Sequence, residues 1–179
     1  MASFSDSFIP LNIALLTISD TRTRENDTSG DYLADALVGA GHKLAGRNII
    51  KDDIYQLRAV VSVWIAAPEI HCILTTGGTG FSGRDNTPQA LTPLFDVNIE
   101  GFGELFRQIS YADIGTSTVQ SRAAGGIANH TLIFCVPGST GACKTAWQGI
   151  LNEQLDSRHS PCNFASQTLV GPNQQHVKR

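Results

Sequence analysis

The sequence predicts an α/β protein with three layers, in which helices cover both faces of a mostly parallel central sheet. Short apolar runs typical of buried strands alternate along the chain with segments whose apolar residues have helical spacing. The 179 residues are 41% hydrophobic and 16% charged, which suits a packed domain and excludes a disordered chain. We therefore expect one domain over residues 1–179, with flexible tails at residues 1–8 and 171–179.

Four segments are expected to form the strands of this sheet. Each is short, apolar and bounded by turn residues or helix signals, and they cover residues 12–18, 44–50, 72–75 and 131–136. The segment at 44–50 is the weakest of the four because Gly46 interrupts it. Strands that are separated by helices are typical of a parallel sheet, so the carboxyl ends of the four are expected at one edge.

The segments between the strands carry the signals of helices. N-cap residues, first-turn prolines and glycine stops place helices at about 29–40, 54–67, 88 onward, 103–111, 119–124 and 140–155. We expect Asp53 to cap the second of these helices, either Asn86 or Thr87 to cap the third, and Ser139 to cap the last.

Charge and composition exclude several classes of protein. A formal net charge of −3 provides no electrostatic footprint for nucleic acid or for an anionic membrane surface. No apolar run approaches the roughly 20 residues of a membrane span, and the first residues lack the basic and apolar parts of a secretory signal. The four cysteines include no C-x-x-C pair, so we expect reduced thiols and no zinc. These features predict a cytoplasmic protein that binds neither nucleic acid nor membrane.

Two glycine-containing loops follow predicted strands and are the sharpest local signals for a binding site. Glycine leaves main-chain amides uncovered, so such loops are able to surround a phosphate at the carboxyl ends of the strands. The alternative is that both loops are tight turns without a ligand. The residues concerned are Thr76, Gly77, Gly78, Thr79 and Gly80 in the first loop, and Pro137, Gly138 and Ser139 in the second.

Neither of two familiar phosphate motifs fits the first loop. Gly78, Gly80 and Gly83 have the spacing of a dinucleotide fingerprint, but they follow the third predicted strand and no helix opens among them. A Walker A loop would require lysine followed by serine or threonine where this chain has Arg84 and Asp85. The sequence therefore indicates a phosphate-binding loop of another kind.

Two aspartates stand beside these loops. Asp52 and Asp85 lie just beyond the second and third predicted strands, which we expect to be neighbours in the sheet. Mg²⁺ commonly takes one or two carboxylates and fills its other positions with water and substrate phosphate. We therefore predict that both aspartates hold Mg²⁺ for phosphoryl or nucleotidyl transfer. The alternative is a structural role for each, with Asp85 as a turn or cap residue. Arg84 either neutralises a phosphate or is a solvated loop residue.

Several longer motifs, taken together, resemble one known family. They are Thr75-Thr76-Gly77-Gly78-Thr79-Gly80 with Arg84-Asp85-x-Thr87-Pro88, Glu100-Gly101-Phe102-Gly103-Glu104-x-Phe106-Arg107, Thr116-Ser117-Thr118-x-Gln120-Ser121-Arg122, Pro137-Gly138-Ser139-Thr140 and Pro161-Cys162-Asn163-Phe164. In this combination the chain resembles the MoaB/MogA family of molybdenum cofactor biosynthesis proteins over residues 8–164, and it looks closest to the MoaB branch.

The resemblance implies a molybdopterin-binding-like fold that binds molybdopterin, a pterin dithiolene phosphate. MogA-like members adenylate molybdopterin with Mg-ATP. The resemblance maps the two important aspartates of the family onto Asp52 and Asp85, its glycine loop onto 77–80, and two serines near its pterin phosphate onto Ser110 and Ser121. It also implies a homo-oligomer, either a trimer or a hexamer.

Three hypotheses about function follow. The first is a molybdopterin adenylyltransferase that uses ATP and Mg²⁺, and the second is a non-catalytic molybdopterin carrier, because MoaB-branch proteins need not share the activity. The third, an oligomeric scaffold, leaves the glycine loops unexplained. The chain also departs from the MogA-like pattern at Asn86, where that pattern has valine. The sequence does not decide between the first two hypotheses.

Overall fold

The computed structural model describes residues 7–169, which form a six-stranded sheet in the order β2-β1-β3-β6-β5-β4. The four strands on one side of this order are parallel, whereas β5 is antiparallel to both β6 and β4. The strands are β1 (Asn12–Ile18), β2 (Lys43–Ile50), β3 (Cys72–Thr76), β4 (Val97–Asn98), β5 (Ala124–Ala128) and β6 (Thr131–Val136). The prediction of a mostly parallel α/β fold is confirmed.

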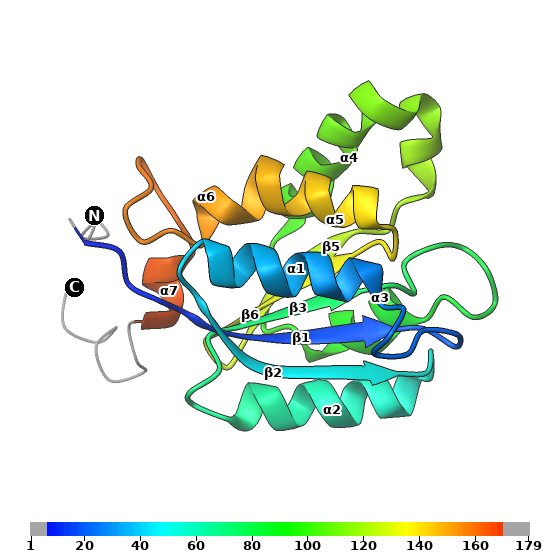
Figure 1. Cartoon of the computed structure of the whole chain (residues 1–179), viewed down its shortest axis with the longest axis horizontal. Helices are drawn as coiled ribbons and strands as arrows, with labels where there is room; N and C mark the ends of the chain where they lie inside the picture. Colours follow the sequence, from blue (N-terminus) through cyan, green and yellow to red (C-terminus); the bar gives the residue numbers. More distant parts are fainter. Residues whose placement is uncertain (1–6, 170–179) are drawn as a thin grey trace.

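Helices cover both faces of the sheet (Figure 1). On one face lie α1, α4, α5 and α6, and on the other lie α2 and α3. The helices are α1 (Thr28–Gly39), α2 (Ile54–Ala66), α3 (Thr87–Leu91), α4 (Glu100–Ile114), α5 (Thr140–Ala146), α6 (Asn152–Gln154) and α7 (Ala165–Leu169). A 3₁₀ helix, η2 (Gly115–Gln120), continues α4, and the two together project beyond the sheet.

Alternating side chains of the parallel strands build a separate core on each face. Ile13 and Leu15 of β1 point toward α1, α4 and α5, while Leu16 and Ile18 of the same strand point toward α2 and α3. The central strands are buried on both faces, as a doubly covered parallel sheet requires. This packing fixes the carboxyl ends of β1, β3 and β6 side by side, and the candidate functional site lies there.

The structure corrects the predicted sheet in two ways. Strands β4 and β5 were not expected, and the helix predicted at 119–124 is instead the end of η2 followed by the start of β5. The strands β2 and β3 are not neighbours, because β1 lies between them. The order of the strands therefore differs from the sequence prediction, although the parallel half was recognised.

The predicted helix at 140–155 and the predicted tails also need correction. The helix consists of α5, a π-helical turn at Trp147–Leu151 and α6. The proposed tail at 171–179 lies outside the described residues, as does most of the tail at 1–8. Phe8 is described, and its ring packs against His42 with the centroids 5.1 Å apart. The short helix α7 was not predicted.

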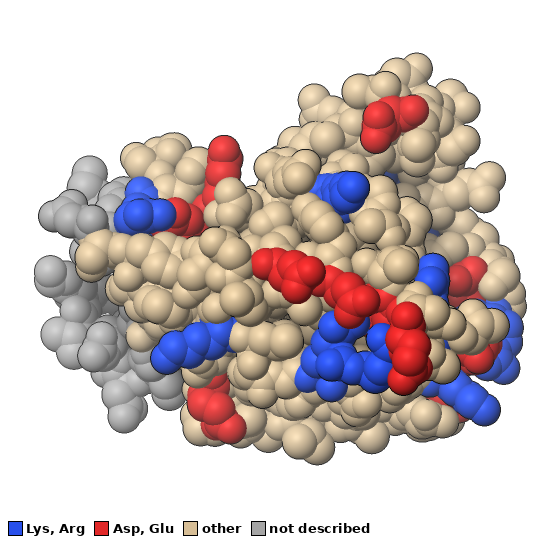
Figure 2. Space-filling model, in the orientation of Figure 1, with Lys and Arg blue, Asp and Glu red and all other residues tan. Residues whose placement is uncertain are grey.

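The surface has no strong patch of one charge on the face shown in Figure 2, where basic groups lie beside a row of acidic groups over α1. None of the described residues belongs to a helix that is long and apolar enough to span a membrane. The four cysteines are free thiols, and three of them are buried.

Candidate functional site

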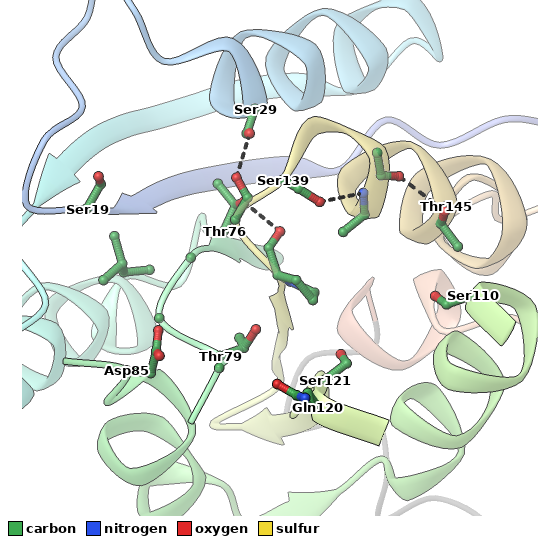
Figure 3. Close-up of a pocket in the computed structure, with 18 of the residues that line it drawn as sticks. Ser19, Ser29, Thr76, Thr79, Asp85, Ser110, Gln120, Ser121, Ser139 and Thr145 are labelled. Atoms are coloured by element: carbon green, nitrogen blue, oxygen red, sulfur yellow. Dashed lines mark hydrogen bonds between the residues drawn. The ribbon is translucent and has the colours of Figure 1, made fainter. Parts of the chain in front are cut away.

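A cavity of about 510 Å³ opens at the carboxyl ends of β1, β3 and β6. The glycine loop after β3 and the loop after β6 form one side, while α4 and η2 form the opposite wall (Figure 3). Polar side chains from these elements, from the loop after β1 and from α1 line the space between them. Those that Figure 3 labels are Ser19, Ser29, Thr76, Thr79, Asp85, Ser110, Gln120, Ser121, Ser139 and Thr145. The sheet topology thus brings most predicted site residues to one place.

Two glycines of the first loop are required by its geometry. Gly77 has a φ of +105°, and a Cβ atom there would lie 2.1 Å from the main-chain oxygen of Ile18. Gly78 has a φ of +64°, and its Cβ would lie 2.4 Å from Oδ2 of Asp52. Glycine adopts such conformations more readily than other residues, and a side chain at either position would also overlap its neighbours. The loop therefore lies against the end of β1 and exposes its main chain to the cavity.

The second loop is joined to the first by close packing and hydrogen bonds. Thr76 Oγ1 donates a hydrogen bond of 3.2 Å to the carbonyl of Pro137, and a Cβ atom at Gly138 would lie only 3.1 Å from Cα of Gly77. Ser29 Oγ of α1 donates a bond of 2.8 Å to the carbonyl of Gly138, which joins the second loop to α1 as well. Ser139 caps α5, as predicted, because its Oγ accepts a hydrogen bond from the amide of Ala142. The two loops are therefore held together and form one continuous side of the cavity.

Asp85 is the predicted catalytic aspartate that lines the cavity. Its Oδ2 accepts a hydrogen bond of 2.7 Å from the amide of Ser82. Hydrogen bonds from Ser82, together with the charge of Arg122, hold the pKa of the Asp85 carboxyl below its ordinary value despite partial burial. Asp85 is therefore an ionised carboxylate at neutral pH.

Asp52 is placed differently, behind the glycine loop. Its side chain is buried, it does not belong to the cavity lining, and both of its oxygens accept hydrogen bonds from the amide of Asn86, at 3.1 and 3.3 Å. Burial raises the pKa of Asp52, and the nearby charges of Asp85 and Asp20 act in the same direction. Asp52 thus supports the loop through the amide of Asn86. It also lies close enough to Asp85 for the charge of Asp85 to raise the pKa of Asp52.

Arg84 does not reach the cavity. Its guanidinium forms two hydrogen bonds with the carboxylate of Asp20, at 3.0 and 2.7 Å, on the exposed surface. It is absent from the cavity lining and its side chain is 65% exposed, which favours the second of the two alternatives, a solvated loop residue. The ion pair instead joins the loop after β1 to the loop after β3.

Comparison with known proteins decides the family. Residues 14–157 match the profile of a family described as "Probable molybdopterin binding domain". Molybdenum cofactor biosynthesis protein B of Escherichia coli (strain K12) is 54% identical over 164 residues, which cover 92% of this chain and 96% of that protein. The protein of the same name from Bacillus subtilis (strain 168) is 42% identical over 142 residues, covering 79% and 84%. The chain belongs to this family, and within it to the MoaB branch.

Solved structures of MoaB proteins agree with this assignment. A crystal structure of molybdenum cofactor biosynthesis protein B superposes with a TM-score of 0.80 at 41% identity, covering 82% of this chain and 92% of that one. The tungsten cofactor synthesizing protein MoaB from Pyrococcus furiosus gives a TM-score of 0.73 at 32% identity, covering 80% and 92%. The three-layer fold is therefore that of the MoaB family.

Several lining residues of this MoaB-family site were missed by sequence reasoning. Asp27 caps α1 and is fully buried, with hydrogen bonds from Thr17, from the amide of Gly30 and from Arg47. Burial opposes its ionisation, but these three donors outweigh burial and hold the pKa of Asp27 below its ordinary value. The position of Asp27 before an apolar helix could have identified it as an N-cap, but nothing in the sequence pairs it with Arg47.

Arg22 and Asp113 were missed for another reason, because each lies in an element whose position only the fold reveals. Arg22 is in the loop after β1, and Asp113 is in the last turn of α4. Among the described residues that line the cavity, Arg22 is the only cationic side chain, against the carboxylates of Asp27, Asp85 and Asp113. No group of three or more metal-ligating side chains occurs within residues 7–169.

Proposed function

We propose that this MoaB-family chain binds molybdopterin in the cavity and transfers AMP to it from Mg-ATP. The observation that carries the proposal is the meeting of a main-chain phosphate loop and an ionised carboxylate, Asp85, at one side of a cavity of about 510 Å³. Phosphate loops and metal-binding carboxylates occur together where phosphoryl or nucleotidyl groups are transferred.

The charge of the cavity supports a requirement for Mg²⁺. Three carboxylates and one arginine line it, although Arg47 neutralises one of the carboxylates, Asp27. A ligand with several phosphate charges would be repelled there unless a divalent cation accompanied it. Because Mg²⁺ takes most of its ligands from water and substrate phosphates, the absence of a larger protein cluster within residues 7–169 is compatible with this role.

In the proposed reaction, Asp85 would hold Mg²⁺ from the loop that lines the cavity. Asp52, which lies behind Gly78 and outside the lining, would provide a second carboxylate. The metal ion would neutralise charge on the phosphates. An oxygen of the molybdopterin phosphate attacks the α-phosphorus of ATP, the bond to the bridging oxygen breaks, and pyrophosphate leaves. The attacking phosphate is already ionised at neutral pH, so no strong general base is needed. Ser110 and Ser121 on the opposite wall are suited to hold the pterin phosphate.

One observation favours the second candidate, a molybdopterin carrier without catalytic activity. Asp52 is 7% exposed and accepts hydrogen bonds from the amide of Asn86, while Arg84 is engaged by Asp20. A carrier requires the two loops and the serines but not a metal site. The two candidates therefore differ in what they require of Asp52 and Asp85.

A turnover assay with a matched variant distinguishes the two. Purified protein is mixed with molybdopterin, ATP and Mg²⁺, and adenylated pterin and pyrophosphate are measured. We expect Asp85→Asn to lower turnover by about 100-fold or more while changing pterin affinity little, since the carboxylate acts on the charge of the transition state. The control is Asp35→Asn, an exposed aspartate of α1 outside the cavity lining. Pterin binding without product in the parent protein would establish the carrier.

We also propose that the chain forms a homo-oligomer, a trimer or a hexamer, in which α4 and η2 take part. These elements project from the body of the molecule, and they expose the apolar side chains of Tyr111, Ile114 and Val119. Exposed apolar side chains gathered on one projection are typical of contact surfaces between proteins. Light scattering coupled to gel filtration measures the mass, and a monomer would contradict the proposal.

A further inference from the structure

Arg122 follows η2 at the edge of the cavity and has no assigned role. It is adjacent to Ser121, which lines the wall formed by α4 and η2, yet its own contacts are on the opposite side. Its Nε donates a hydrogen bond of 3.3 Å to the carbonyl of Thr79, and its Nη2 donates to the carbonyls of Gly80 and Asp85, the latter at 2.8 Å. Arg122 thus spans from one wall of the cavity to the other.

The three carbonyls that receive these bonds lie at both ends of one loop. Thr79 and Gly80 are at its start, and Asp85 is at its end, so the guanidinium joins the two ends of residues 79–85. The main chain of Arg122 adds a further bond, from its amide to the carbonyl of Thr79, at 3.2 Å. The exposed ring of Phe81 covers the guanidinium, with Cζ of Arg122 5.0 Å from the ring centroid.

Without the Arg122 side chain, the loop keeps the bonds within its own turn and, on its exposed side, the ion pair of Arg84 with Asp20. Within it, the amide of Ser82 donates to Asp85 Oδ2 and the amide of Asp85 donates to the carbonyl of Ser82. Both bonds lie inside the turn, so they fix its shape but do not fix its place in the molecule. Behind it, Asn86 is bound to Asp52, which anchors only the last part of the segment. The guanidinium therefore restrains the loop from the side of the opposite wall.

Arginine is suited to this task by its shape. A planar guanidinium has five N–H donors in a fixed arrangement and remains charged at any physiological pH. Lysine places one compact charge at the end of a flexible chain and cannot reach three separated carbonyls with the same geometry. The positive charge also lies close to the Asp85 carboxylate, whose pKa it helps to lower.

We propose that Arg122 is a positioning residue that holds the Asp85 loop at a fixed distance from the wall carrying Ser121. It does not line the cavity, so it acts on the reaction through Asp85 and not by contact with substrate. The part of the proposal that concerns turnover rests on the proposed adenylyl transfer. The part that concerns the loop does not, because it follows from the contacts of Arg122 alone.

Hydrogen exchange in the full-length protein tests the positional role directly. In Arg122→Gln we expect the amides of residues 79–86 to exchange about tenfold faster, since hydrogen bonds to a charged group contribute more than neutral ones. Arg122→Lys is expected to give a smaller increase in the same segment. The matched control is Arg58→Gln, which removes an arginine that donates to the carbonyls of Gln89 and Ala90 outside the cavity.

Exchange in residues 79–86 that is no faster in Arg122→Gln than in Arg58→Gln would overturn the proposal. If Arg122→Gln does not fold, Arg122→Lys keeps the charge and decides the question by the same measurement, with unchanged exchange as the contradicting result. The exchange measurement tests the position of the loop whether or not the parent protein adenylates molybdopterin. If the parent protein forms no adenylated molybdopterin, the proposed adenylyl transfer is refuted. The positional role of Arg122 is then decided by the exchange data alone.

Kinetics separate a positional role from a purely structural one. If the parent adenylates molybdopterin, we expect Arg122→Gln to lower kcat by about 100-fold, because small displacements of a reacting group are costly. The KM for molybdopterin is expected to stay within about twofold, and the Mg²⁺ concentration for half-maximal rate to rise. An equal loss in kcat and in the fraction of folded protein, with unchanged Mg²⁺ dependence, would indicate a structural role only.

Discussion

The two ends of the parallel sheet use their polar groups in opposite ways. At the amino ends, the amides of Leu11 and Asn12, just before and at the start of β1, donate hydrogen bonds to Nδ1 of His42 and Nδ1 of His71, at 3.2 and 2.9 Å. The His42 ring is enclosed between Phe8 and Trp147. The first amides of the strand are thereby satisfied inside the protein, and this end is closed.

At the carboxyl ends, β3 and β6 lead into glycine loops, and the cavity opens beside them and the end of β1. Gly77 and Gly78 adopt left-handed conformations there, and the carboxylate of Asp85 lies at the cavity surface. Two ends of one sheet thus differ because of a few residue choices, with histidines that close one end and glycines that open the other. The comparison shows that the cavity depends on glycines, which have no side chain, as much as on the polar side chains that line it.

The largest expected effect on stability comes from adding a side chain to the glycine loop at the carboxyl end of β3. Gly77→Ala would place a Cβ atom 2.1 Å from the main-chain oxygen of Ile18 at a φ of +105°. We expect the free energy of unfolding to fall by about 4 kcal/mol, from steric overlap and backbone strain together. Chemical denaturation measures the loss, and pterin binding is expected to be lost in the protein that still folds.

The control for this substitution is Gly83→Ala in the same loop. No atom lies within 4 Å of the position of its Cβ, and its φ is not in the left-handed region. A stability within about 0.5 kcal/mol of the parent is expected, as for surface substitutions in general. Equal losses in the two variants would show that the loop responds to any added methyl group and not to the geometry of Gly77.

A smaller effect is expected from the charge pair beneath the cavity. In Arg47→Met the buried carboxylate of Asp27 loses its partner at 2.9 Å, which we expect to cost about 3 kcal/mol of stability. The double variant Asp27→Asn with Arg47→Met is expected to recover part of this loss, because no charge then remains buried. A double variant less stable than Arg47→Met alone would contradict this explanation.

The smallest expected effect concerns the closed end and depends on pH. Burial lowers the pKa of His42 and of His71 below the ordinary value of 6.5, although the charge of Asp156 opposes the shift at His42. The unfolded chain therefore binds protons more readily than the folded one. The stability from neutral histidines is present above pH 6.5 and is lost as the pH falls below it, toward the lowered values in the folded protein.

Urea midpoints at about pH 7.5 and about pH 5.5 measure this dependence. His42→Asn keeps an acceptor near the position of Nδ1 but does not titrate, so we expect a shallower fall in its midpoint over this range. A variant whose midpoint falls as steeply as that of the parent would show that His42 does not contribute. The glycine loops carry no histidine, so the effect belongs to the closed end alone.

The parallel half of the fold was predictable because its strands are short apolar runs between well-marked helices. The antiparallel half was not, since β5 contains Gly125 and Gly126, which are poor strand residues. The reason for Gly126 lies in tertiary packing, because a Cβ atom there would lie 2.2 Å from the ring of Phe95. Contacts between residues 31 positions apart leave no local pattern in a sequence.

For the site, the sequence identified the glycines and Asp85 because their chemistry is visible in the residue types. It could not show that Arg84 is bound by Asp20, which lies 64 positions away, or that Asp52 lies behind the loop. Arg122 belongs to a motif of the MoaB/MogA resemblance, but its three carbonyl partners appear only in the folded chain. The residue types were enough to predict which loops line the cavity. The hydrogen-bond partners of the individual side chains became visible only in the structure.

The two outer strands of the sheet have a consequence for how the protein behaves at high concentration. An exposed strand edge invites a strand from another copy, which leads to aggregation. Here β4 has only two residues, and β2 begins with the charged, exposed Lys43 and pairs irregularly with β1 next to Ala14. Short, charged and irregular edges are poor templates for further strands, so copies of this chain are expected to meet through their helices and not to extend the sheet into fibrils.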